Sequence, residues 1–138
     1  VDFDATNVHV GDAAQTQFAG IIRYEFLPDA YFKVRFVHFR NQYANFDPFD
    51  LTGDNKGRES WIMPAYSQFE LHAGYRFKIE KIRLDLRASV LNLFDVTYLT
   101  DAQNNDSFVS NTTDFDAKSA SVFFGQGRRF NISLQITF

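Results

Sequence analysis

The chain lacks cysteine, contains no long apolar run and carries no excess of positive charge. With 0 Cys in 138 residues, it cannot form disulfides or thiolate metal sites. No apolar run approaches the ~18 residues that a membrane-spanning helix needs. A formal net charge of -3 gives no reason to expect nucleic acid as a partner. The chain begins at Val1 without a basic and apolar leader, so we expect a mature product, a fragment or part of a longer protein.

Phenylalanine is abundant instead, with 17 Phe and an aromatic content of 17%. Mean hydropathy is nevertheless modest, at -0.28. Many aromatic residues without a long apolar run indicate that apolar and polar residues alternate one by one, which is the period of a β-strand. We therefore expect an all-β fold with no helix.

Five segments show this alternation, at about 16–26, 31–43, 67–77, 82–92 and 128–138. Tight turns near Pro28 and Glu80 join the first strand to the second and the third to the fourth. Long extracellular loops are expected at about 44–66 and 97–127. Short connections at one end and long ones at the other are typical of outer-membrane barrels.

Phenylalanine also recurs at a fixed spacing in the first, third and fifth strands. The pairs are eight residues apart, at Phe18 and Phe26, Phe69 and Phe77, and Phe130 and Phe138. Eight residues of strand span ~27 Å, which a tilt of ~40° reduces to roughly 21 Å, close to the ~25 Å apolar band of such barrels. One face of each strand is apolar, and the other carries the charge expected of a water-filled lumen.

Two points temper this interpretation. A soluble antiparallel sheet with one buried face would show the same alternation. His38 falls in the apolar set, for which we expect either a bulge or a strand that has already left the membrane.

Two motifs resemble a known family. One is N-L-F-D-x-x-Y, formed by Asn92, Leu93, Phe94, Asp95 and Tyr98 after M-P-A-Y at 63–66 and a strand ending Y-R-F at 75–77. In this order it resembles the end of TonB-dependent receptors, and the loops D-A-Q-N-N and F-F-G-Q-G look like those of the Bacteroidota. The other resembles the C-terminal assembly signal of outer-membrane proteins and comprises Gly127, Phe130, Ile132, Leu134, Ile136 and Phe138.

The resemblance covers about 61–138 and implies an antiparallel transmembrane β-barrel of roughly 22 strands with an N-terminal plug. Residues 1–138 would be about five C-terminal strands of it, in the bacterial outer membrane. Their open edges could not face lipid, so we do not expect them to fold alone. The implied partners are outer-membrane lipid, the remaining barrel and plug, the TonB complex through the N-terminal part, the barrel-assembly machinery and an imported ligand.

The implied function is TonB-dependent active import of a scarce or large ligand, with no enzymatic activity and no cofactor. The ligand stays open among iron chelates, haem, corrinoids, glycans and peptides. The alternatives are a receptor-like barrel that serves as a structural subunit of a larger outer-membrane complex, a passive porin, or an outer-membrane enzyme.

The polar residues offer no catalytic site. His72 lies beside Glu70 in the strand pattern, but no nucleophile accompanies it, so we expect a polar lumen lining. Asp47, Asp50 and Asp54 lack the spacing of a calcium loop, and loop solubility is the favoured interpretation.

The loops contain the remaining candidates. Phe49, Trp61 and Phe108 either contact a ligand or pack the loops together. Asn92 and Asp95 are expected to bond local backbone in a turn, and the sequon at 111–113 is expected to be chance.

Overall fold

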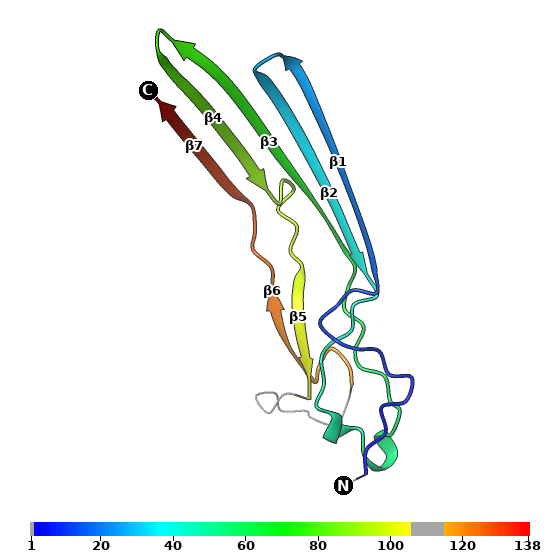
Figure 1. Ribbon diagram of the computed structural model, residues 1–138. Coiled ribbons are helices and arrows are strands. Elements are labelled where there is room, and N and C mark those ends of the chain that lie inside the picture. The colour runs from blue at the N-terminus through cyan, green and yellow to red at the C-terminus, as the bar shows by residue number, and fades with distance from the viewer. Residues whose placement is uncertain (1, 106–114) are drawn as a thin grey trace. The chain divides into compact units, whose positions relative to one another are not determined.

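The computed structural model describes residues 2–105 and 115–138, and Figure 1 shows their course. The chain is all-β with antiparallel sheets, as expected. In chain order the elements are β1 (Thr16–Leu27), β2 (Ala30–Arg40), the 3-10 helices η1 (Pro48–Asp50) and η2 (Gly53–Asn55), β3 (Tyr66–Ile79), β4 (Ile82–Leu91), β5 (Leu99–Asn104), β6 (Ala120–Phe124) and β7 (Arg129–Thr137).

Five strands form one open sheet in the order β1-β2-β3-β4-β7. In the β3–β4 ladder, Phe77 lies opposite Leu84 and Arg76 opposite Asp85. In the β4–β7 ladder, Leu84 lies opposite Ile136. This register places apolar residues opposite apolar residues and polar opposite polar, so each face of these three strands is uniform in polarity.

The strands that the alternation predicts are present, with one clear change of boundary. The two-residue turn at Pro28 and Asp29 joins β1 to β2. The second strand ends at Arg40 rather than near residue 43. The reason is that Asn41 has a φ of 55°, a left-handed conformation that cannot continue a strand.

His38 of β2 has partners within the five-stranded sheet for both its ring and its polar atom. Its ring stacks on Phe18 at 6.3 Å between centroids. Its Nδ1 lies 2.8 Å from the Ser67 hydroxyl, so its polar atom is satisfied within the sheet.

The chain divides into two compact units, and each is described by itself. The strand unit comprises Phe18–His38, Ser67–Thr97 and Gln126–Phe138. The loop unit comprises Val1–Gln17, Phe39–Tyr66 and Tyr98–Gly125.

The loop unit is more ordered than the sequence suggests. Both expected loops contain regular structure, because β5 and β6 pair within the second and two 3-10 helices lie in the first. A small core of Ala44, Met63 and Ala102 is buried, with Trp61 packed against it. The fully buried Asn104 donates a 3.1 Å hydrogen bond to Ser119. A buried asparagine at a core position disguises the alternation of β5, since polar residues are expected on the exposed face.

Candidate functional site: the two faces of the five-stranded sheet

The first feature of the strand unit is an apolar face that is open to its surroundings. Its side chains extend over all five strands, from β1 to β7. Their exposed fractions include Ile22 71%, Phe26 52%, Phe130 69%, Ile132 79%, Leu134 54% and Ile136 49%. Cross-strand pairs such as Leu86 and Leu134 continue the face from β4 to β7. Large apolar side chains with this exposure mark a surface that contacts protein or lipid.

The opposite, polar face carries its charges in short-range pairs. Arg35 contacts Glu70 at 2.7 Å, and Glu70 also lies 3.3 Å from His72. Arg87 and Asp85 form a bidentate pair with bonds of 3.0 and 2.9 Å. His72 therefore lies among charged side chains on this face.

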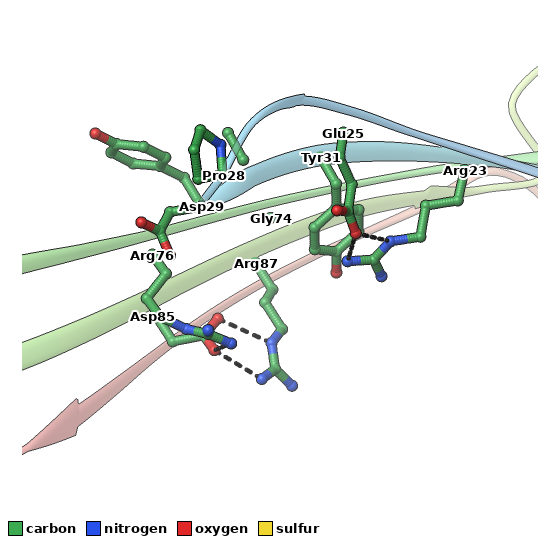
Figure 2. Close-up of a pocket in the computed structure, with 11 residues that line it drawn as sticks. Arg23, Glu25, Pro28, Asp29, Tyr31, Gly74, Arg76, Asp85 and Arg87 are labelled. Carbon is green, nitrogen blue, oxygen red and sulfur yellow. Dashed lines mark hydrogen bonds and ion pairs between the residues drawn. The ribbon is translucent and has the colours of Figure 1, made fainter.

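A tyrosine is clamped between a glycine and an arginine on this face (Figure 2). The ring of Tyr31 lies against Gly74, where an added Cβ would stand 2.7 Å from ring Cζ and 2.9 Å from the hydroxyl oxygen. The Arg23 guanidinium lies 3.7 Å from the centre of the same ring. Arg23 also binds Glu25 at 2.9 Å, which fixes the guanidinium in this place. The three residues come from β1, β2 and β3, so the clamp joins three strands.

The clamp borders a hollow of about 420 Å³ on the polar face. Arg76, Asp85 and Arg87 line it from β3 and β4. Figure 2 shows the Asp85–Arg87 pair on one side of this hollow and the Arg23–Glu25 pair on the other. The lining offers charged donors and acceptors, and its described residues do not bring a nucleophile and a general base together.

The two polar residues of the N-L-F-D motif hold a turn. Asn92 is 4% exposed, and its side chain bonds Val96 N–H at 2.9 Å, Val96 carbonyl at 2.9 Å and Gln126 carbonyl at 3.2 Å. Asp95 accepts a 2.7 Å hydrogen bond from the Arg128 backbone N–H. A Cβ at Gly127 would lie 3.1 Å from the same Asp95 oxygen, so glycine allows this approach. The bonds of Asn92 with Val96 agree with the expected turn role. Asp95 bonds distant backbone instead of local backbone, and its contact and that of Asn92 with Gln126 join the end of β4 to the start of β7.

Leu93 and Phe94 are the central residues of this turn, which the Asp95 N–H closes on the Asn92 carbonyl at 2.9 Å. Leu93 donates its backbone N–H to the Phe69 carbonyl at 2.8 Å. Phe94 is 66% exposed and meets the Phe69 ring edge-to-face at 5.3 Å. Tyr98 belongs to the loop unit, where its ring covers Gly125 and contacts Tyr66 at 4.5 Å between centroids.

The residues of the C-terminal motif line one strand. Phe130, Ile132, Leu134 and Ile136 are exposed on the apolar face of β7, and Phe138 is 93% exposed just beyond it. Gly127 precedes β7 at the Asp95 contact. The apolar residues of this motif in β7 therefore belong to one exposed surface.

The proposed loop aromatics fall into three situations. Phe49 is 63% exposed and meets Phe3 edge-to-face at 5.9 Å. Trp61 packs on the loop core, which favours a packing role. Phe108 and the sequon at 111–113 lie outside the described residues.

Asp47 and Asp50 of the loop unit lie at the ends of the 3-10 helix η1. Asp47 accepts the Phe49 N–H at 2.9 Å and so caps η1. Burial, followed by repulsion from Asp47, raises the pKa of Asp50. In 2–105 and 115–138, no three His, Cys, Asp or Glu side chains are grouped as a metal site.

A second acidic contact brings together distant parts of the loop unit. Burial and then repulsion from Asp101 raise the pKa of Asp12 above its ordinary value. Asn45 donates a 3.2 Å hydrogen bond to the Asp12 carboxylate. Gly11 lies directly against the Asn45 backbone, where an added Cβ would be 2.6 Å from its Cα.

Comparison of the chain with protein-family models, curated proteins and solved structures found no match. No helix in the described residues is long and apolar enough to cross a membrane.

The clamp and the network around Asn104 were not predicted from the sequence. One signal for the clamp was available, because Gly74 interrupts the interior of a regular strand pattern. Such a glycine often marks a close approach of another group to the backbone. Its partner Tyr31 could not be identified, since strand alternation does not reveal the pairing between β2 and β3.

Proposed function

We propose that this chain is a wall segment of a transmembrane β-barrel in the bacterial outer membrane, and that the barrel is a TonB-dependent receptor. The five-stranded sheet would be the C-terminal part of the barrel. Its apolar face would contact lipid, and its polar face would line the lumen. The function of the whole protein would be active import of a scarce or large ligand.

The observation that carries the membrane proposal is the exposed apolar face. Ile22, Ile132 and Leu134 are each more than half exposed, on strands from both edges of the sheet. At ~25 cal/mol per Å², leaving such side chains in water forfeits about 1.5–3 kcal/mol apiece. A lipid surface removes this cost over the whole face at once.

The lengths of the connections between strands also support a barrel wall in the outer membrane. Two-residue turns join β1 to β2 and β3 to β4, whereas long segments follow β2 and β4. Outer-membrane barrels place short turns at the periplasm and long loops outside. The loop unit would therefore be extracellular and available to a ligand.

The receptor proposal depends on the resemblance of the motifs. The contacts of Asn92 and Asp95 give that motif a physical task, since they secure the passage from β4 to β7. A structural subunit or a passive porin would use the same wall. In cells that make the full-length protein, uptake of the imported ligand should stop when a protonophore collapses the proton gradient or when TonB is removed. Uptake that continues under both treatments would indicate a porin.

A pair of neighbouring substitutions tests the membrane proposal. In the full-length protein, Leu134→Arg should lose roughly 2–4 kcal/mol of folding stability, because it places a charge in the lipid-facing band. Gln135→Arg should be mild, since Gln135 lies opposite Asp85 on the polar face. The fraction of heat-modifiable folded protein on gels measures both.

Gln135→Arg is the matched control for Leu134→Arg, because the two substitutions introduce the same side chain one residue apart. Equal losses for both would contradict the assignment of the faces. Recovery of the wild-type protein in the soluble fraction without detergent would contradict the membrane location.

A further inference from the structure

The turn formed by the N-L-F-D motif continues the apolar face past the end of the β3–β4 ladder. The last apolar pair of that ladder is Leu71 and Val90. Phe69 lies two residues before Leu71, so it shares the apolar face one step beyond the ladder. The turn takes the place of β4 at this step, since Leu93 donates its backbone N–H to the Phe69 carbonyl at 2.8 Å.

Phe94 extends the apolar face with an exposed ring. This ring meets Phe69 edge-to-face at 5.3 Å between centroids, and Phe69 in turn lies 4.8 Å from Phe36 of β2. We call the three rings the outer aromatic row. Phe94 ends the row and is 66% exposed. A large exposed ring that continues an apolar surface marks a contact with another molecule.

The backbone of the turn is fixed on both sides of this ring. Asn92 and Asp95 have φ values of 51° and 54°, a left-handed conformation that asparagine and aspartate adopt more readily than most residues. The buried Asn92 amide bonds the N–H and the carbonyl of Val96. It also donates to the Gln126 carbonyl at 3.2 Å, and Asp95 accepts the Arg128 N–H at 2.7 Å. The ring is therefore held in one place relative to β3, β4 and β7.

The position of the outer aromatic row along β3 places it at one end of the apolar band. Phe69 and Phe77 are eight residues apart, which corresponds to ~27 Å along the strand. Phe77 lies near the short β3–β4 turn, so Phe69 and Phe94 lie at the end where the connections are long. In the proposed barrel this end is the outer boundary of the membrane. Apolar faces that contain aromatic residues bury themselves about 5–10 Å into the boundary between head groups and acyl chains.

We propose that the N-L-F-D turn is an anchor in the outer leaflet, in which Phe94 places its ring at the boundary between lipid head groups and acyl chains. Asn92 is the positioning residue, because its bonds hold the turn against β7. The occupant is lipid because the ring continues the face that the proposed function assigns to lipid, and the anchor rests on that function. A turn joined to three strands would fix the depth at which β4 and β7 cross the membrane surface.

Depth-dependent quenching of fluorescence tests the anchor in the full-length protein, in phosphatidylcholine vesicles. The acyl chains carry bromine either near the head group or near the methyl end. The difference in emission between variant and wild type isolates the added tryptophan. Phe94→Trp should be quenched several-fold more by shallow bromine than by deep bromine. Leu134→Trp should show the reverse, since Leu134 lies midway between Phe130 and Phe138.

Phe49→Trp is the matched control, because Phe49 is 63% exposed and Phe94 is 66% exposed. Phe49 belongs to the loop unit, and neither bromine should quench a tryptophan there. Emission from Phe94→Trp that neither bromine quenches would overturn the anchor. Stronger quenching by deep bromine would also overturn it, because the ring would then lie among the acyl chains. Equal quenching of Phe49→Trp and Phe94→Trp would show that exposure alone produces the signal, with the same consequence.

A second substitution tests Asn92 without removing the ring. Asn92→Asp keeps the acceptor for the Val96 N–H and loses the bonds donated to the Val96 and Gln126 carbonyls. In the Phe94→Trp background it should reduce the contrast between shallow and deep quenching several-fold. Asn131→Asp introduces the same change in β7, opposite Ser89, and should leave the contrast unchanged. An unchanged contrast in Asn92→Asp would overturn the positioning role.

The same vesicles separate the anchor from the proposed function. Deep quenching of Leu134→Trp together with unquenched Phe94→Trp would refute the anchor and keep the membrane wall. Shallow quenching of Phe94→Trp together with unquenched Leu134→Trp would refute the membrane wall and keep the contact between the ring and lipid.

Discussion

The Tyr31 clamp leads to a sharp test at Gly74. In Gly74→Ala the new methyl group would occupy the space of the tyrosine ring, since the built Cβ stands 2.7 Å from ring Cζ. The Tyr31 side chain can rotate more easily than the β3 backbone can shift, so the ring must turn away from that backbone. Doing so also removes it from the Arg23 guanidinium, which now lies 3.7 Å from its centre.

The expected magnitude follows from the interactions that the displaced ring gives up. A cation–π contact at a partly exposed site contributes about 0.5–1 kcal/mol, and removing the ring from its packed position costs about 1–2 kcal/mol more. Replacing a strand glycine by alanine returns roughly 0.5–1 kcal/mol of backbone entropy. The net loss of folding stability should be about 1–2 kcal/mol.

Denaturant titration of the full-length protein in lipid vesicles, read as folded band on gels, measures this loss. Gly20→Ala is the matched control, because nothing lies within 4 Å of a Cβ built at Gly20. That variant should be neutral or slightly more stable. In a Tyr31→Ala background, Gly74→Ala should cost nothing. A similar loss with and without Tyr31, or at Gly20 as well, would refute the clamp.

Two other predictions concern the C-terminus and the loop unit. Deleting Phe138 should lower the amount of protein inserted in the outer membrane far more than Phe77→Ala does, because an assembly signal acts before the barrel exists. The inserted fraction of the deletion variant should still melt near the wild-type temperature. If the loss of abundance follows the loss of melting temperature in both variants, Phe138 is only a rim aromatic. The raised pKa of Asp12 means that the folded loop unit holds this proton more tightly than the unfolded chain, so stability present below the ordinary value of 3.8 is lost as pH rises through the raised value. Asp12→Asn should reduce that loss, seen as a weaker pH dependence of amide exchange at Gln15, which bonds Asn41 at 3.0 Å, after correction for intrinsic rates. Unchanged pH dependence in Asp12→Asn would contradict the role of this carboxyl.

Much of the strand unit could be predicted because one physical rule governs it. Each residue of a strand alternates between two faces, so the apolar set of β7 was readable from Phe130 to Phe138 without knowledge of its neighbours. The turn at Pro28 was readable for a similar reason, since proline and aspartate preset local geometry. In each case the determinant lies within a few residues of its effect.

The features that escaped prediction depend on contacts between distant residues. Tyr31 covers Gly74 across 43 positions of sequence, and Asn104 is buried because Ser119 satisfies it. Nothing local distinguishes this tyrosine from one that faces water. Lys78 and Arg83 show the same limit, because they are ordinary alternating residues until the ladder places them opposite each other. Register converts two regular strand patterns into a local repulsion, which neither strand shows by itself.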